Sequence, residues 1–206
     1  MNKIIQQQLR HRSIRKFEKK AISEEIISGL IEVAQHIATS NYAQSYSILS
    51  ITDFKKKKAI SEIGEQAYIA DSAHLFIMLA DKARNAAIIS SLDGPTEIFS
   101  TFDKFFIGAT DVILAAQNIM LAAESQGIGG VFLGSVLNDM EKLIEILELP
   151  PLVIPVLGIA LGYPDQEPQM KPRIPENLIH FKNNYPKNWR HLSDELKDYN
   201  ATEPKI

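Results

Sequence analysis

Residues 107–125, IGATDVILAAQNIMLAAES, carry the strongest structural signal in this 206-residue chain. Almost every position is apolar or small, which predicts a helix that is apolar on every side. Such a helix must be covered all round, and a domain of this length rarely wraps a central helix completely. We therefore expect a homodimer with this helix at the seam. Asp111, Gln117 and Asn118 interrupt the run, so we do not expect it to cross a membrane.

Strands are predicted both before and after this helix in the sequence. Residues 73–80 read AHLFIMLA and residues 153–161 read VIPVLGIAL, as expected of strands that are buried on both faces. Residues 23–34 predict an amphipathic helix that begins with a serine cap. The chain shows no internal repeat and no long linker, so we expect one domain of mixed helices and strands over residues 1–206. The aromatic residues at 99–106 are typical of a core or an interface, or they line a ligand cleft; the pattern leaves their role open.

Several kinds of chemistry are excluded by composition and motif order. The chain has no cysteine, which removes disulfides, thiolate catalysis and thiolate-bound zinc. The five histidines show no metal-ligand spacing, so no metal site is expected. The glycines at 127–130 follow a helix and precede a strand, the reverse of the dinucleotide-binding order. Without a conventional nucleophile, any enzymatic activity would depend on a bound cofactor. No signal peptide is evident at the N-terminus, so we expect a cytoplasmic protein.

The charge is unevenly distributed along the chain. The net charge is −3, yet residues 1–20 hold seven basic side chains and one acid, and residues 171–190 hold five and one. A nucleic-acid surface normally carries positive charge through the whole domain, so no nucleic-acid partner is expected. Two basic segments at opposite ends of an acidic chain suggest that they converge on a small anion. Solvated basic surface at both termini is the alternative.

Residues 10–15, RHRSIR, gather four possible cations and a hydroxyl donor into six positions. Residues 171–173, KPR, place two further cations on either side of a proline. Guanidinium groups bind phosphate oxygens in bidentate fashion, and serine adds a neutral donor. These clusters predict a phosphate site, although spacing alone also fits a solvated basic turn.

The order of motifs resembles that of the flavin-dependent nitroreductase family. The motifs are RHRSIRKF at 10–17, GIGGVFLGS at 127–135, ALGYP at 160–164, KPRIP at 171–175 and IHFKNNY at 179–185. The resemblance runs from about residue 5 to about residue 185 and is strongest to the oxygen-insensitive, NADPH-dependent nitroreductases and flavin reductases. It implies an α+β fold with a mostly antiparallel central sheet flanked by helices. It also implies an intertwined homodimer with FMN at the interface, in which residues 1–206 form a single FMN-binding domain whose last 20 or so residues are an extension.

The resemblance also implies which residues contact FMN. They are His11, Arg12, Ser13, Ile14 and Arg15, then Thr39 and Gln66, then Phe132, Leu133, Gly134 and Ser135, and finally Lys171, Pro172 and Arg173. Asn41 and Tyr42 are expected beside the substrate. No catalytic side chain is expected, because N5 of the flavin carries the hydride while Arg15 supports the ring. Lys171 and Arg173 are expected to join residues 11–15 around the FMN phosphate.

The implied activity is the reduction of nitroaromatics, quinones or free flavins by two-electron hydride transfer from NADPH or NADH. The physiological acceptor stays open, because such pockets admit many planar oxidants. The choice between NADPH and NADH is also open. Relatives in this group often carry arginines for the extra phosphate of NADPH near their C-termini, where this chain has Lys197 and Lys205. The alternative is a non-enzymatic or specialised flavin-binding dimer of the same fold that acts on one unidentified metabolite.

Overall fold

The computed structural model describes residues 1–188 and 192–200. The chain comprises two units, Met1–Glu167 and Pro168–Ile206. The second unit includes the short helices η4 (Glu176–Leu178), α8 (Leu192–Glu195) and α9 (Lys197–Asn200). The first unit contains the β-sheet and the helices that pack on it. One domain over residues 1–206 stays a prediction.

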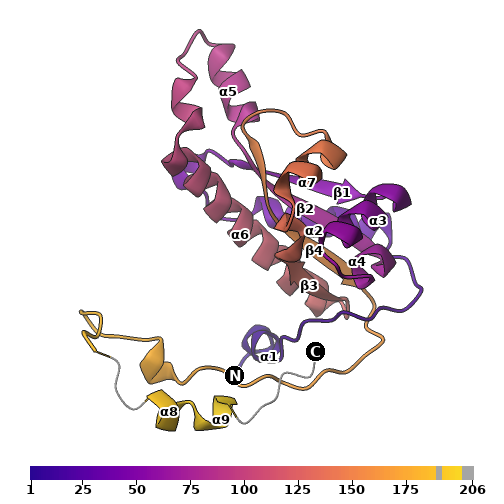
Figure 1. The fold of residues 1–206 in the computed structure, drawn as a ribbon, viewed down its shortest axis with the longest axis vertical. Coiled ribbons are helices and arrows are strands. Elements are labelled where there is room, and N and C mark those ends of the chain that lie inside the picture. Colours follow the sequence, from indigo (N-terminus) through magenta and orange to yellow (C-terminus); the bar gives the residue numbers. More distant parts are fainter. Residues whose placement is uncertain (189–191, 201–206) are drawn as a thin grey trace. The chain divides into compact units, whose positions relative to one another are not determined.

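The sheet has four strands, all paired antiparallel, in the order β1-β2-β4-β3 (Figure 1). The strands are β1 (Tyr46–Ile51), β2 (His74–Asp81), β3 (Gly129–Leu133) and β4 (Val153–Gly162). Every residue of β2 is buried, as the unbroken apolar run predicts. The predicted antiparallel sheet of an α+β fold is therefore confirmed.

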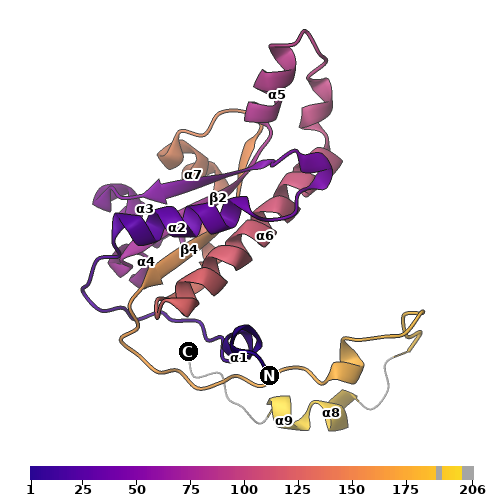
Figure 2. The ribbon, with the colours of Figure 1, turned by 180° about the vertical axis from the view of Figure 1, so that it is seen from behind.

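Helices cover both faces of the sheet, and each face has its own hydrophobic core. On one face, α2 (Glu24–Gln35) and α6 (Phe102–Ser125) pack against Phe76, Met78 and Ile159 (Figure 2). On the other face, α3 (Phe54–Ile63), α4 (Tyr68–Asp71) and α7 (Met140–Leu147) pack against Leu75, Ile77 and Val131. The remaining helices of this unit are α1 (Lys3–Leu9), η1 (Ser40–Tyr42), α5 (Ala83–Ser90), η2 (Glu97–Ser100) and η3 (Ser135–Leu137).

Helix α6 begins at Phe102, five residues before the apolar run that predicts it. Its length and composition would also suit a membrane span. In the structure it is a core helix, because one side packs on the sheet and the carboxylate of Asp111 accepts a hydrogen bond of 2.9 Å from the buried backbone N–H of Ser45. The expectation that the helix is covered on every side is not met within one chain, since Phe106, Ile113 and Leu114 are exposed.

Pro155 lies near the start of β4 and at a local edge of the sheet, as expected of a proline in a strand. Pro155 is the third residue of β4, and β3 pairs only with Gly158–Gly162, so β4 has no β3 partner at Pro155. The pairing register with β2 shifts between Met78 and Leu79, where Leu157 and then Pro155 are the partners. Proline has no N–H to donate to a ladder, so a stretch of strand with a neighbour on one side only suits it.

Candidate active site

The predicted basic segment lies along the start of β3. The backbone N–H of Ile14 donates a hydrogen bond of 2.9 Å to the carbonyl of Gly130. Two glycines make this approach possible: a Cβ on Gly129 would lie 2.5 Å from Cγ1 of Ile14, and a Cβ on Gly162 would lie 2.7 Å from the ring of Phe17. The GIGG and ALGYP motifs therefore have a packing role, because they let residues 14–17 lie directly on the sheet.

The polar side chains of this segment have different surroundings. The Nδ1 atom of His11 lies 2.5 Å from Oε1 of Glu124, and one terminal nitrogen of Arg12 lies 3.4 Å from Oε1 of Glu167. The Nε atom of Arg12 is buried and has no hydrogen-bond partner in the described part of the chain. Ser13 is half-buried, and Arg15 is exposed. The segment thus presents cations, including one unsatisfied donor, next to β3.

A second cluster of predicted residues lies just beyond the other end of β3. The hydroxyl of Ser135 donates a hydrogen bond of 2.9 Å to Oε1 of Gln66, and the hydroxyl of Tyr68 donates to the same atom at 2.6 Å. Gly134, between β3 and η3, is exposed, and nothing lies within 4 Å of a Cβ placed on it. The first amides of such a short helix have no intrahelical acceptor. Gly134 therefore borders open space, and the polar side chains of Ser135 and its partner Gln66 are half-buried next to it.

The other two residues of β3 that are predicted to contact FMN are Phe132 and Leu133, and their side chains lie on opposite faces of the sheet. The side chain of Leu133 is 1% exposed and belongs to the core on the α7 face, so its contact with a ligand can involve only its backbone. Phe132 is partly buried against the opposite core. Since β3 rises about 3.3 Å per residue, the hydrogen bond at Gly130 and the cluster at Ser135 are roughly 17 Å apart along the chain at most. The structure thus places residues 11–15 beside the start of the edge strand β3 and the Gln66–Ser135 cluster just beyond its end.

The loop that contains Thr39, Asn41 and Tyr42 lies at the opposite end of the sheet. It precedes β1, whose Tyr46 pairs with Ala80 near the end of β2. Residues 11–15 lie at the other end, because Gly130 pairs with Leu161 and Leu161 pairs with His74. The eight residues of β2 extend for about 26 Å. Within one chain, therefore, the structure does not bring this loop together with residues 11–15.

The loop itself has an unusual backbone. Asn41 and Tyr42 have φ angles of 52° and 54°, in the left-handed region that non-glycine residues seldom adopt. The backbone N–H of Gln44 donates to the hydroxyl of Thr39 at 3.4 Å, and the Nδ2 atom of Asn85 donates to the carbonyl of Ala43 at 2.9 Å. Tyr42 is 82% exposed. The loop thus holds a large aromatic side chain out in solvent.

Lys171, Pro172 and Arg173 belong to the second unit. There, the guanidinium of Arg173 donates a hydrogen bond of 2.8 Å to the carbonyl of Lys171. The convergence of these cations with residues 11–15 stays a prediction.

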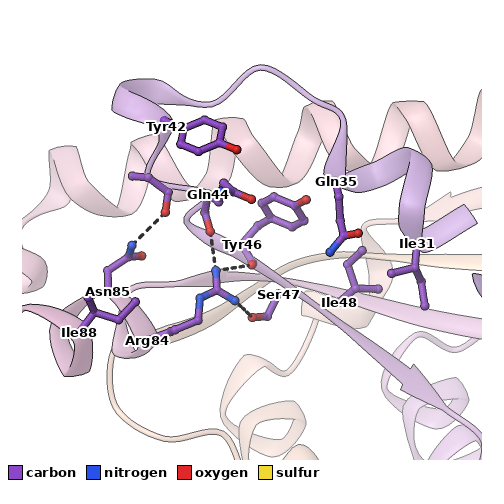
Figure 3. A pocket seen from close by; sticks show the side chains of 11 residues that line it. Ile31, Gln35, Tyr42, Gln44, Tyr46, Ser47, Ile48, Arg84, Asn85 and Ile88 are labelled. Atoms are coloured by element: carbon purple, nitrogen blue, oxygen red, sulfur yellow. Dashed lines mark hydrogen bonds between the residues drawn. The ribbon is translucent and has the colours of Figure 1, made fainter.

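An open cavity of 540 Å³ lies beside the loop, between α2, β1 and α5 (Figure 3). Tyr42 lines it, together with Arg84 of α5, whose guanidinium donates hydrogen bonds to the carbonyls of Gln44 and Tyr46. Tyr42 is the one residue of the predicted site among those that line it. Arg84 gave no signal in the sequence, because a single arginine at the start of a weak helix is usually solvated.

Two further residues contact the predicted site and were not predicted from the sequence. Glu124 is the partner of His11, and Tyr68 is a partner of Gln66. Tyr68 follows Gln66 by two positions, so a contact between the two could have been predicted from the local sequence. Glu124 is 113 positions from His11, and nothing in the spacing of the chain links the two.

The four-stranded antiparallel sheet with helices on both faces, and with a basic segment laid along an edge strand, defines an α+β protein. The chain belongs to the nitroreductase family, whose model matches residues 9–163. The resemblance inferred from the five motifs is thereby confirmed. The matched region includes every predicted site residue except Lys171, Pro172 and Arg173.

Individual relatives agree with this assignment. The chain is 34% identical over 204 residues to an FMN reductase (NADPH) of Bacillus subtilis, covering 98% of this chain and 82% of the relative. It is 36% identical over 193 residues to an NADPH-dependent oxidoreductase of Staphylococcus haemolyticus, covering 92% and 77%.

Solved structures resemble the chain over most of its length. The NfrA1 nitroreductase of B. subtilis superimposes with a TM-score of 0.91 at 33% identity, covering 95% of this chain and 80% of that one. The NADPH:FMN oxidoreductase of Vibrio harveyi, solved in complex with NAD⁺, gives a TM-score of 0.88 at 33% identity, with 97% and 84% covered. The predicted fold is therefore that of the family.

Proposed function

We propose that this protein is an FMN-dependent oxidoreductase that uses NADPH or NADH to reduce nitroaromatics, quinones or free flavins by two-electron hydride transfer. The observation that carries the proposal is that residues 11–15 and the Gln66–Ser135 cluster lie at the two ends of one edge strand in a nitroreductase fold. The names of the relatives, FMN reductase (NADPH) and NADPH-dependent oxidoreductase, support a reduction that uses NADPH and involves FMN.

The residues present fit an FMN phosphate. The buried Nε–H of Arg12 has no acceptor among the described residues, and a phosphate oxygen would supply one. His11, Ser13 and the backbone at Ile14 lie in the same segment. We assign these residues, together with Lys171, Pro172 and Arg173, to the phosphate end of the site. A buried donor that lacks an acceptor is otherwise costly, which favours an anionic ligand here.

The Gln66–Ser135 cluster fits the flavin ring and its ribityl chain. Phe132, Leu133, Gly134 and Ser135 would lie along one face of the ring, with Leu133 contributing its backbone. Bound FMN would supply the hydride-carrying N5 atom, so no side chain of this protein needs to act as an acid or base. Arg15 would place a positive charge beside the ring, and a charge-assisted contact of this kind contributes about 1.5–3 kcal/mol.

We propose that the site is completed by a second copy of the chain. Thr39, Asn41 and Tyr42 lie at the opposite end of the sheet from residues 11–15, so in one chain they do not reach the same flavin. A homodimer would let the loop of one protomer meet residues 11–15 of its partner. The exposed apolar side chains of α6, such as Phe106 and Ile113, fit a seam between the two copies.

The remaining assignments follow from this function. We propose that residues 1–206 act as a single FMN-binding domain, with the last 20 or so residues as an extension, in a cytoplasmic enzyme. The partner is a small-molecule electron acceptor, and we expect neither nucleic acid nor a membrane. The cavity beside Tyr42 and the exposed phenylalanines at the start of α6 are the surfaces that we expect to shape the choice of acceptor.

The visible spectrum before and after anaerobic addition of each pyridine nucleotide tests this function. We expect purified protein to bind FMN and the yellow colour to bleach with NADPH or NADH, then return on adding a quinone or nitroaromatic. Protein that remains colourless and takes up no added FMN would refute the proposal. Protein that binds FMN but is not reduced by either nucleotide would instead favour the non-enzymatic flavin-binding dimer. Reduction by a nucleotide without turnover of any general acceptor would favour an enzyme specialised for one metabolite.

A further inference from the structure

Glu124 occupies an electrostatically unfavourable position. It is in the last turn of α6, where no basic side chain is present, and its side chain is 15% exposed. The C-terminal end of a helix carries partial negative charge, so a carboxylate there is destabilised unless a cation is close. Among the described residues, the imidazole of His11 contacts this carboxylate, with its Nδ1 atom 2.5 Å from Oε1 of Glu124.

His11 lies where the C-terminal ends of two helices meet. Its backbone N–H donates to the carbonyl of Gln8 in the last turn of α1 at 3.3 Å. The side chain of Gln7 in α1 donates to the carbonyl of Leu121 in α6 at 2.6 Å, so the ends of the two helices are joined. Figure 2 shows α1 beside the C-terminal end of α6. Both helix ends and the Glu124 carboxylate therefore favour a positive charge on His11.

The hydrogen bond between His11 and Glu124 also determines which ring nitrogen of His11 carries a proton. A carboxylate can only accept, so Nδ1 of His11 carries a proton in this contact. If the ring were neutral, Nε2 would be an acceptor and would repel a phosphate oxygen. If the ring is an imidazolium, Nε2 carries a proton and can donate. Nε2 makes no hydrogen bond among the described residues.

We propose that Glu124 is a positioning residue for FMN binding, which holds His11 as an imidazolium and leaves its Nε2–H to donate to the FMN phosphate. The proposal rests on the proposed function, in which residues 11–15 bind that phosphate. Glu124 acts through His11 and touches neither substrate nor flavin. The imidazolium of His11 thereby gives the site one cation more than its lysines and arginines supply.

A count of charges alone predicts that loss of Glu124 strengthens FMN binding, which is the opposite of the effect expected from our proposal. FMN carries a negatively charged phosphate, so removing a nearby carboxylate should strengthen its binding if charge alone matters. Glu167, which pairs with Arg12 and is 89% exposed, is the matched control for that effect. Glu124→Gln and Glu167→Gln each remove one negative charge and keep the shape of the side chain.

The experiment is titration of the flavin-free protein and of both variants with FMN and with riboflavin, which lacks the phosphate. We expect Glu124→Gln to weaken FMN binding about fivefold, because a charge-assisted hydrogen bond is roughly twice as strong as a neutral one. Riboflavin affinity should stay unchanged, and Glu167→Gln should leave FMN binding unchanged or slightly stronger. Equal losses for FMN and riboflavin would show a merely structural role, and tighter FMN binding by Glu124→Gln would overturn the proposal.

A second measurement requires no flavin. Nitrogen-15 spectra of the histidine side chains at pH 7 distinguish imidazolium from neutral imidazole, and a His11→Asn variant identifies the signal of His11 among the five histidines. We expect the imidazolium signal in the original protein and a neutral signal in Glu124→Gln. A neutral His11 in the original protein would overturn the proposal. Failure of the protein to bind FMN at all would refute the proposed function instead, so the two failures are distinguishable.

Discussion

The hydroxyl of Ser135 donates a hydrogen bond to Oε1 of Gln66 across 2.9 Å, although 69 positions separate the two residues in the chain. Gln66 precedes α4, and Ser135 begins η3 just after β3. Close packing keeps the two together, because a Cβ on Gly64 would lie 3.0 Å from Oγ of Ser135. A polar pair held this firmly is suited to orient a ligand.

Removing the amide at this pair should weaken flavin binding. Gln66→Ala deletes the acceptor shared by Ser135 and Tyr68 and with it any hydrogen bond from the amide to the flavin. We expect FMN affinity to fall about tenfold, since one hydrogen bond contributes on the order of 1 kcal/mol and the freed hydroxyls lose their partner. Fluorescence titration with FMN measures the change. Tyr68→Phe removes a neighbouring hydroxyl alone and is the control; an equal loss in that variant would argue that Gln66 has no contact of its own with the flavin.

Arg15 is expected to support the reduced flavin ring. Arg15→Ala should lower FMN affinity and slow the reduction by NADPH or NADH, because a positive charge beside the ring is lost. Stopped-flow absorbance under anaerobic conditions measures the reduction. The adjacent Lys16 is also exposed, and its ammonium pairs with Asp165 at 2.7 Å, so Lys16→Ala is the matched control and should behave like the original protein. Unchanged flavin content and rates in Arg15→Ala would contradict the assignment.

The close approach of the basic segment to the sheet depends on Gly129. In Gly129→Ala the new Cβ would meet Ile14 at 2.5 Å and Pro164 at 2.9 Å, so residues 11–15 must shift. We expect a stability loss of about 1–3 kcal/mol from this overpacking, together with weaker FMN binding. Gly29→Ala, in α2 with nothing within 4 Å of the new Cβ, should instead stabilise the protein by about 0.5–1 kcal/mol. Denaturant unfolding and FMN titration test both variants, and normal FMN affinity in Gly129→Ala would speak against the role given to this segment.

A site divided between two protomers should show complementation. One variant carries Arg12→Ala and Arg15→Ala, and the other carries Asn41→Ala and Tyr42→Ala. Each alone should have little activity, because every site contains one altered segment. Random mixing in a co-refolded sample should restore about a quarter of the sites, since half of the dimers are mixed and each of those has one intact site. Steady-state turnover of the mixture measures this. No recovery in mixtures that contain mixed dimers would indicate that both segments come from the same chain.

His74 should make stability depend on pH. Burial and the charge of Lys57 lower the pKa of His74 from 6.5 to about 4. The unfolded chain therefore takes up the proton first as the pH falls. The stabilisation is fully present above pH 6.5 and is lost as the pH falls towards 4, with a total of roughly 3 kcal/mol.

His74→Phe should remove this pH dependence while keeping an aromatic ring against Phe76, whose centroid lies 4.4 Å from that of His74. Between pH 7 and pH 4.5, the free energy of unfolding should fall by about 2 kcal/mol more in the original protein than in the variant. Urea unfolding at the two pH values gives both numbers. The same decrease in both proteins would mean that His74 is not the group responsible.

The amino-acid sequence by itself determined the kinds of element and the family. The apolar run of β2, the cap and stripe of α2 and the long apolar helix α6 are local patterns, and each depends on neighbours within a few positions of the chain. The five motifs in order were sufficient for the nitroreductase resemblance. Patterns of this kind carry the period of burial, which is why they predicted the individual helices and strands. The antiparallel α+β arrangement was implied only by the family resemblance.

Only the tertiary structure decided which distant residues meet. The partnership of His11 with Glu124, the pairing of Gln66 with Ser135 and the register shift at Pro155 depend on how strands align and helices pack, and no local period encodes a partner 69 or more positions away. The same alignment places Tyr42 and Ile14 at opposite ends of the sheet. The sequence was thus sufficient to infer which side chains have the chemistry to bind FMN. The positions of these side chains relative to one another follow from packing across the whole sheet.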